Sequence, residues 1–182
     1  MPATFFRPRE HSGRMSEEAI FREDQRVRQW WIWAMVLGIA IATYYAAYVQ
    51  LVQGIPFGDN PGPDWVVILV LVGAGFLLPL FIGSIKLTTE VRREGLFMRF
   101  RPFHRRFKDM RLFDAIDAKT IQYRPLRDFG GWGIRFGDLG TAYTISGRWG
   151  LLVSYPGNEQ VLIGTLRPQE LEMAVALIRR KG

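Results

Sequence analysis

The chain has 182 residues, a formal net charge of +7 and no cysteine. A chain without cysteine forms no disulfide, no thiolate metal site and no thiol nucleophile. Its length allows one soluble domain of ordinary size together with a modest membrane portion. The most apolar stretches lie in the first half and the remainder is strongly charged, so the average hydropathy describes neither part.

Residues 1–15 contain Pro, Gly and Arg without apolar periodicity, which predicts a flexible arm. Ser16 can cap a helix with Glu17 and Glu18 in its first turn, so we predict a cytoplasmic helix over residues 16–29, continuous with the first apolar run. Its thin apolar stripe fits the membrane surface, the C-terminal domain or solvent. A secretory signal is a poor fit, because a long polar stretch precedes the apolar run.

Two long uncharged segments predict transmembrane helices. Residues 30–53 form the first and residues 65–85 form the second. As helices, both match a hydrocarbon core of about 30 Å. Residues 54–64 between them are rich in Gly and Pro and contain no Lys or Arg, which predicts a short external loop.

The flanking charges predict that both chain ends are cytoplasmic. Six arginines precede the first span, and nine Lys or Arg lie between Lys86 and Arg111. Basic flanks of membrane spans stay on the cytoplasmic side. Trp30, Trp31 and Trp33 are expected at the cytoplasmic interface, where amphipathic rings are favoured. The positive charge is therefore assigned to topology and anionic headgroups rather than to nucleic acid.

Small residues recur every four positions on both predicted spans. The stripe on the first span is Ala34, Gly38, Ala42 and Ala46, and the stripe on the second is Gly75, Pro79 and Gly83. Such helix-packing stripes let helix backbones approach closely. We expect the two stripes to face each other within the hairpin; the alternative is that they pack on another membrane protein.

Residues 86–182 are predicted to form an all-β cytoplasmic domain, because short strand-like runs alternate with turn signals. The predicted strands are residues 86–91, 96–103, 107–112, 120–124, 133–136, 141–146, 151–155 and 160–165. Residues 168–180 change to a helical period, with Pro168 in the first turn. The predicted fold class is a membrane α-helical hairpin plus a small β sandwich or barrel capped by a C-terminal helix.

The order of elements over residues 65–180 resembles that of bacterial pleckstrin-homology-like (PH-like) domains in small membrane proteins with two N-terminal transmembrane helices. The resemblance is carried by the direct join Ile85-Lys-Leu-Thr-Thr-Glu-Val91, by Gly130-Gly-Trp-Gly-Ile-Arg135 and by Ile163-Gly-Thr-Leu-Arg-Pro-Gln-Glu-Leu171. It implies a non-catalytic adaptor domain at the face of the bacterial cytoplasmic (inner) membrane. It implies no phosphoinositide pocket and no particular site residue.

Residues 99–108 are the densest basic and aromatic run in the chain. Its basic members are Arg99, Arg101, Arg105, Arg106 and Lys108. Each cation near an anionic surface contributes about 1 kcal/mol, so we predict contact with the membrane surface or a partner protein. The alternative is an exposed hairpin with outward charges. Nucleic acid is disfavoured, because the aromatics alternate as in a strand core.

No catalytic, cofactor-binding or metal-binding residue is predicted. His11 and His104 are the only histidines and neither lies in a predicted span, which argues against intramembrane axial ligation and a multi-His metal site. The glycines of residues 130–137 lack the spacing of a phosphate-binding loop. Asp114 and Asp117 have no base or nucleophile beside them in sequence. We therefore do not expect an enzyme.

The preferred hypothesis is a structural or accessory subunit that packs on a larger integral membrane complex (respiratory, photosynthetic or transport) and grips its cytoplasmic face. The alternatives are a sensor or binder of anionic lipid at that surface, and a membrane enzyme with an unrecognised site. The expected partners are other integral membrane proteins and anionic lipid headgroups, with no cofactor and no nucleic acid.

Overall fold

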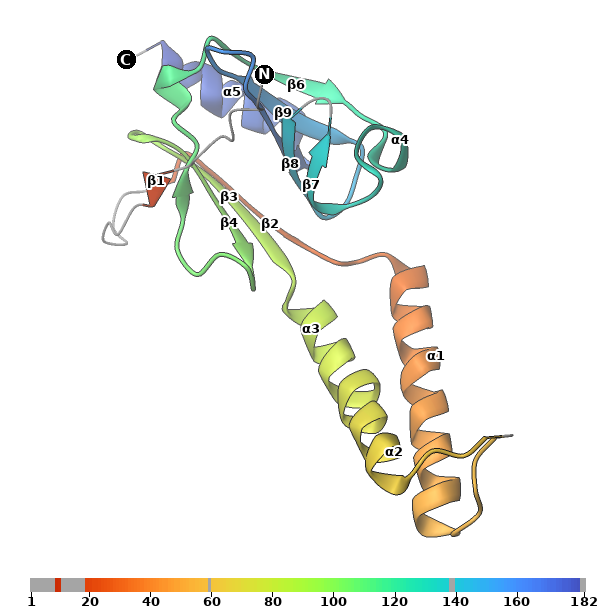
Figure 1. The fold of residues 1–182 in the computed structure, drawn as a ribbon. Helices are drawn as coiled ribbons and strands as arrows, with labels where there is room; N and C mark the ends of the chain where they lie inside the picture. The colour runs from red at the N-terminus through yellow and green to blue at the C-terminus, as the bar shows by residue number, and fades with distance from the viewer. Residues whose placement is uncertain (1–8, 11–18, 59, 138–139, 181–182) are drawn as a thin grey trace. The chain divides into compact units, whose positions relative to one another are not determined.

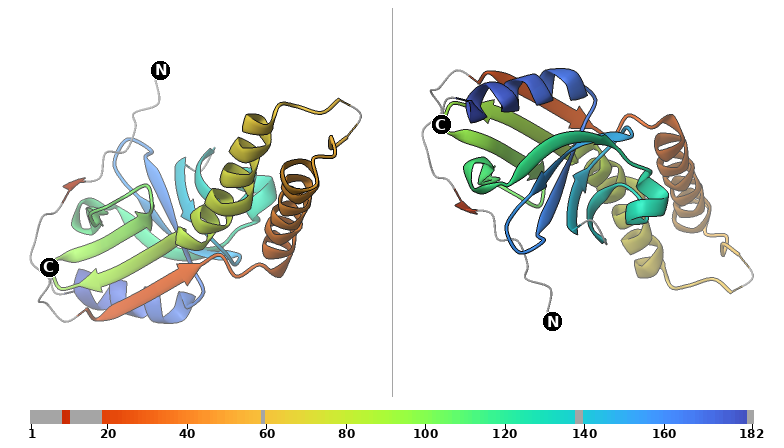
Figure 2. Two further views of the ribbon diagram at one scale, coloured as in Figure 1. Left: turned by 90° about the horizontal axis from the view of Figure 1, so that it is seen from below. Right: turned by 90° about the horizontal axis from the view of Figure 1, so that it is seen from above.

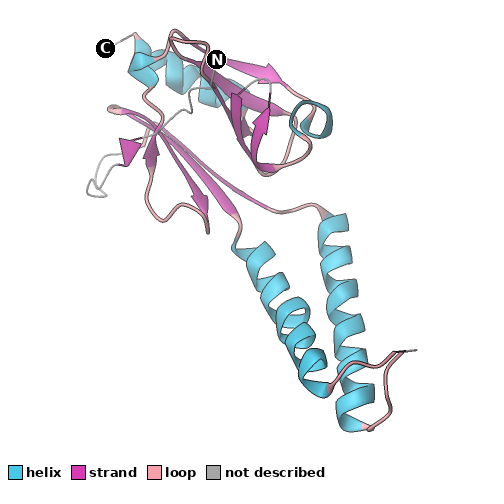
Figure 3. Cartoon of the chain, viewed as in Figure 1, coloured by secondary structure: helices cyan, strands magenta, loops and turns pink. Residues whose placement is uncertain are grey.

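The computed structural model describes residues 9–10, 19–58, 60–137 and 140–180. The chain divides into two compact units, a helical hairpin of residues 27–85 and a β unit that joins the N-terminal residues up to Arg26 to residues 86–182 (Figure 1). Figure 3 shows that strands occur only in the second unit. The β unit is therefore discontinuous in sequence, and the hairpin is inserted between two of its strands.

The hairpin consists of two antiparallel helices. The first is α1 (Trp30–Ala47), which continues into a π-helical turn (Tyr48–Val52). The returning helix comprises α2 (Asp64–Val70), a π-helical segment (Leu71–Leu77) and α3 (Leu78–Ser84). Both helices are long and apolar enough to cross a membrane, and most of their surface is exposed.

The π-helical segment has a local cause in Pro79. Proline has no N–H to donate to the carbonyl four residues earlier, and its ring crowds that carbonyl. The wider turn relieves this conflict: the N–H of Leu78 bonds to the carbonyl of Gly73, five residues back. Near the loop, the Gln50 side-chain amide donates to the Asp64 carboxylate at 2.9 Å and ties the two helices together.

The first sheet of the β unit is fully antiparallel and has the order β1-β5-β4-β3-β2. Its strands are β1 (Arg9–Glu10), β2 (Phe21–Arg26), β3 (Lys86–Arg92), β4 (Gly95–Arg101) and β5 (Lys108–Asp109). A short 3-10 helix, Leu112–Asp114, follows β5 and leads to the second sheet.

Strand β2 corrects the prediction of a helix over residues 16–29. Residues 16–18 and most of the predicted arm lie outside the described residues, but Phe21–Arg26 is a strand paired with β3. Its burial alternates, with Phe21, Glu23 and Gln25 inward and the residues between them outward. Pairing with β3 and this period-two burial outweigh the weak i,i+4 charge pairs that suggested a helix.

The second sheet has the order β6-β9-β10-β8-β7, and β8 and β10 are its one parallel pair among the described strands. Its strands are β6 (Asp117–Gln122), β7 (Gly133–Gly137), β8 (Gly140–Thr144), β9 (Trp149–Ser154) and β10 (Gln160–Thr165). A short helix that the sequence did not predict, α4 (Pro125–Phe129), precedes β7.

The core lies between the inner faces of the two sheets and α5 (Pro168–Arg179), which packs on β2 and β3 of one sheet and on β6 and β9 of the other (Figure 2). Its helical period presents Leu171, Val175 and Ile178 to that core. Each such side chain contributes about 1.5–3 kcal/mol when fully buried. A smaller cluster around Tyr123 and Leu152 covers the other face of the second sheet, and burial raises the pKa of Tyr123 to about 12.

A buried carboxylate joins β2 to the end of β10. Glu23 accepts three hydrogen bonds, from the Thr165 hydroxyl at 2.6 Å, the Leu166 backbone N–H at 2.8 Å and the Gln25 amide at 3.1 Å. The same amide donates to the Gly164 carbonyl at 2.8 Å. Buried polar groups need such partners, so these bonds hold the strand that precedes the hairpin onto the second sheet.

Candidate functional site

The seam of the hairpin involves only part of the predicted helix-packing stripes. Gly75 is buried against α1: a Cβ at this position would lie 3.1 Å from Thr43 Oγ1. A Cβ at Gly83 would lie 3.6 Å from the Trp33 ring, and Pro79 is half-buried. The two glycines of this stripe, Gly75 and Gly83, therefore contact α1 within the hairpin.

The stripe on the first helix lies on the opposite side. The buried residues of α1 are Val36, Ala40 and Ala47, whereas Ala34, Gly38 and Ala42 are exposed, Ala46 is half-buried and a Cβ at Gly38 would meet nothing within 4 Å. A separation of two residues is about 200° around a helix. The prediction that the two stripes face each other is wrong, because Val36, Ala40 and Ala47 form the buried side of α1 in place of the stripe.

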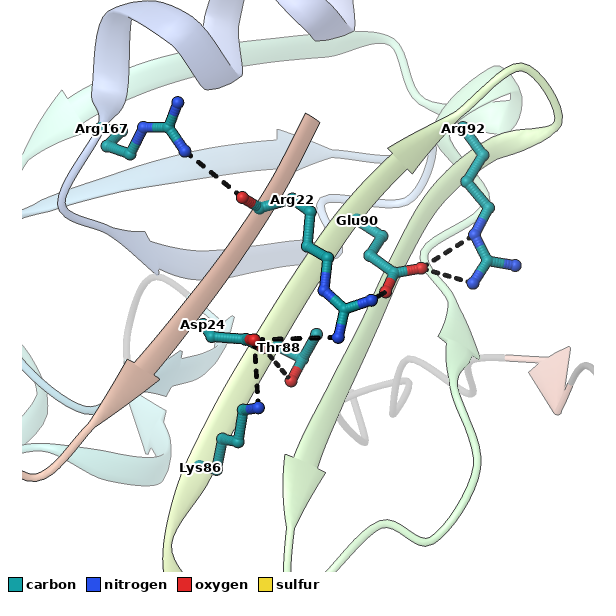
Figure 4. A network of polar contacts seen from close by, with 7 residues as sticks. All are labelled: Arg22, Asp24, Lys86, Thr88, Glu90, Arg92 and Arg167. Atoms are coloured by element: carbon teal, nitrogen blue, oxygen red, sulfur yellow. Dashed lines mark hydrogen bonds and ion pairs between the residues drawn. The ribbon is translucent and has the colours of Figure 1, made fainter. Parts of the chain in front are cut away.

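The outer face of the first sheet carries a network of charged side chains from β2 and β3 (Figure 4). Asp24 accepts a hydrogen bond from the Thr88 hydroxyl at 2.7 Å and lies 3.1 Å from Lys86 Nζ. Glu90 lies 3.3 Å from an Arg22 guanidinium nitrogen and accepts a bond from Arg92 Nε at 2.9 Å. Both acidic side chains of this face, Asp24 and Glu90, therefore form ion pairs with basic residues of the same sheet.

These contacts shift the pKa of Asp24. Burial by itself would raise the pKa of this carboxyl, but the Thr88 hydrogen bond, the contact with Lys86 and the charge of Arg22 outweigh it and lower the pKa below 3.8. The ionised form is therefore the one that the network stabilises.

Two arginines of this face lie on aromatic rings. The Arg99 guanidinium lies 4.4 Å from the centre of the Phe107 ring, and Arg92 lies 5.1 Å from Phe97 and 5.2 Å from Phe107. Burial and the neighbouring charge of Arg101 lower the pKa of Arg99. The Arg99 side chain therefore packs on the Phe107 ring and does not extend into solvent.

The other predicted contact residues separate into two groups. Arg101, Arg105 and Arg106 are exposed at the end of β4 and in the loop after it, whereas Lys108 is half-buried in β5 opposite Met98. In the helical unit, Trp30 and Trp31 are exposed, and Trp33 is partly buried with its indole N–H donating to the Val27 carbonyl at 3.0 Å.

Sequence reasoning counted Arg26 and Lys86 only as charges that flank the helices and did not predict them as contact residues. The strand register places Lys86 opposite Arg26 on one side and opposite Arg101 on the other. Their adjacency depends on β2 being a strand, so the helix predicted over residues 16–29 concealed it. Phe21 is the only apolar residue from Phe21 to Arg26, so the sequence itself shows no period-two apolar pattern there that would indicate a strand.

A groove between β2 and α5 has no cluster of charged side chains like that on the first sheet. It is lined by apolar side chains that include Ile20, Met173 and Leu177, while Arg167 lies over the Phe21 ring and pairs with Glu170. Within the described ranges no three His, Cys, Asp or Glu residues lie close enough to hold a metal ion.

The fold and its charged surface define a class of protein: a discontinuous β unit with an inserted hairpin of two apolar helices, each long enough to cross a membrane. The chain belongs to a family of unknown function, DUF6141, whose sequence model matches residues 13–176. No curated protein and no solved structure matches it.

Proposed function

We propose that this protein is a membrane-anchored, non-enzymatic accessory subunit that packs on another integral membrane protein. The two helices anchor it, both chain ends lie in the cytoplasm, and the β unit acts as an interaction module at the cytoplasmic face. The PH-like resemblance belongs to this proposal as an expectation about the adaptor role of the β unit.

The observation that carries the proposal is the direction of the small-residue stripe on α1. Ala34, Gly38 and Ala42 are exposed on the side of α1 opposite to the seam. In lipid, helices associate through close backbone contact at such residues, because apolar tails give no hydrophobic force between helices. A face that the hairpin leaves open suits a helix from another chain.

The charges around the helices support the proposed orientation. Arg26 and Arg28 precede α1 and Lys86 follows α3, whereas residues 54–64 between the helices contain no Lys or Arg. Basic residues are retained on the cytoplasmic side during insertion. Both strands that flank the hairpin then emerge on that side.

The test is to fill the stripe. We expect the tagged full-length protein, extracted in mild detergent, to migrate in a stoichiometric particle well above its own 21.0 kDa. Gly38→Leu/Ala42→Leu should release it, because the added side chains keep the partner helix away. Val70→Leu/Val72→Leu adds bulk at exposed positions of the second helix and should leave the particle intact.

Two outcomes contradict the proposal. One is a wild-type protein that migrates alone, at its own mass in the detergent micelle. The other is a particle made only of copies of this chain, which would assign the stripe to self-association.

A further inference from the structure

We propose that the end of the first sheet nearest the hairpin in the chain binds anionic lipid headgroups. The surface consists of Arg26, Lys86 and Arg101 in one row across β2, β3 and β4, extended by Arg105 and Arg106 in the loop after β4; we call it the basic rim. This inference rests on the membrane anchoring of the proposed function and adds a ligand for the β unit.

The register makes the basic rim a cluster. Lys86 is the direct cross-strand partner of both Arg26 and Arg101, so three cations share one face. Neighbouring strands lie about 4.8 Å apart, which places the three within about 10 Å in the sheet. Directly opposed like charges destabilise a sheet. An anion from outside the chain would offset that repulsion.

The acids of this face do not neutralise the rim. The next row inward pairs Asp24 with Thr88 and Thr88 with Arg99, and Glu90 lies one row further. Asp24 reaches Lys86, but among the described residues neither Arg26 nor Arg101 has an ion pair. Positive charge therefore concentrates at one end of the sheet, while the acids are paired behind it.

The loop after β4 adds an apolar anchor. Phe103 is 59% exposed, and its ring centre lies 5.9 Å from that of the buried Phe100. Arg105 and Arg106 follow it and are exposed. An exposed aromatic side chain among cations is the composition of segments that lie in the headgroup region of a bilayer.

Covalent reach favours lipid over a protein or nucleic acid partner. Arg26 lies four residues before the first residue of α1, and Lys86 lies two residues after the last residue of α3. Four extended residues span at most about 14 Å. With the apolar helices in a bilayer, Arg26 and Lys86 are held within that distance of the hydrocarbon boundary, where headgroup phosphates are the nearest anions.

The experiment is hydrogen exchange on the full-length protein in lipid nanodiscs of phosphatidylcholine, with and without phosphatidylglycerol. We expect exchange of peptides covering residues 99–108 to slow by about fivefold with the anionic lipid, the effect of one cation near an anionic surface. Raising the salt from about 0.1 to about 1 M shortens the screening length from about 10 to about 3 Å and should remove the difference.

Charge-matched variants locate the effect. Arg26→Gln/Arg101→Gln should abolish the lipid dependence of exchange. Arg93→Gln/Arg180→Gln removes the same amount of charge from exposed positions in the β3–β4 turn and after α5. This second variant should retain the lipid dependence of exchange. Near-identical melting temperatures of the variants would establish that both are folded.

The outcomes separate this inference from the proposed function. Incorporation into nanodiscs with protected helices, but exchange that is indifferent to phosphatidylglycerol, overturns the basic rim as a lipid site and leaves the anchor intact. If both double variants lost the lipid dependence of exchange equally, the effect would come from net charge alone, and the basic rim as a lipid site would again be overturned. Failure of the helices to gain protection in any lipid refutes the anchor itself.

Discussion

The Glu23 side chain is buried inside the β unit, and its three hydrogen bonds link two sheets. Sequence alone assigned this residue to a cytoplasmic helix. Its inward direction follows from the pairing of β2 with β3, a contact between residues more than sixty positions apart. Local sequence preferences contain no information about such a partner.

We expect Glu23→Ala to lower the free energy of unfolding of the β unit by about 2–4 kcal/mol, because the Thr165 hydroxyl and the Leu166 N–H lose a buried acceptor. The measurement is thermal or denaturant unfolding in detergent, followed by fluorescence. Glu94→Ala in the exposed β3–β4 turn is the control and should change stability by less than about 0.5 kcal/mol. Equal effects of the two changes would refute the proposal that buried hydrogen bonds of Glu23 link the two sheets.

At the scale of elements, the apolar helices and α5 were predictable, because an uncharged run of sufficient length and a helical apolar period are local signals. Strands β3, β4, β9 and β10 were also predicted within a few residues. The parallel pairing of β8 with β10 was not, since it depends on which strands meet after a connection through β9.

Gly140 provides a test of that pairing. Its φ is +81°, and a Cβ there would lie 2.0 Å from the Gln160 carbonyl oxygen at the start of β10. We expect Gly140→Ala to destabilise the β unit by about 3 kcal/mol or more, the sum of an unfavourable φ and a backbone displacement. The decrease in the midpoint of thermal or denaturant unfolding measures this destabilisation.

Gly157→Ala is the matched comparison, since Gly157 has φ +84° with nothing within 4 Å of a Cβ. It should lose only about 1 kcal/mol, the cost of the backbone conformation. If the two substitutions cost the same, the close approach of Gly140 to β10 is incorrect.

At the scale of the whole molecule, the inserted hairpin makes the two flanking strands neighbours in one sheet. Strand β2 ends at Arg26, β3 begins at Lys86, and the two residues pair. A chain that crosses a membrane twice returns to the side from which it started, so this pairing requires an even number of crossings. The proposed topology therefore agrees with the fold of the β unit.

Because the chain has no cysteine, single cysteines can report its topology directly. We expect Gly58→Cys to react with a membrane-impermeant maleimide applied to intact cells, and Asn158→Cys to react only after the membrane is opened. Labelling of both positions, or of neither, in intact cells would contradict a hairpin with both ends in the cytoplasm.

The sequence by itself determined the two apolar helices, the basic residues around them and the C-terminal helix, because length, charge and apolar period are properties of short segments. Tertiary structure alone decided that residues 21–26 form a strand, that the stripe on α1 lies away from the seam, and that Arg26, Lys86 and Arg101 form a row. Each depends on register between segments distant in sequence, and register is set by the burial of whole faces and not by any local pattern.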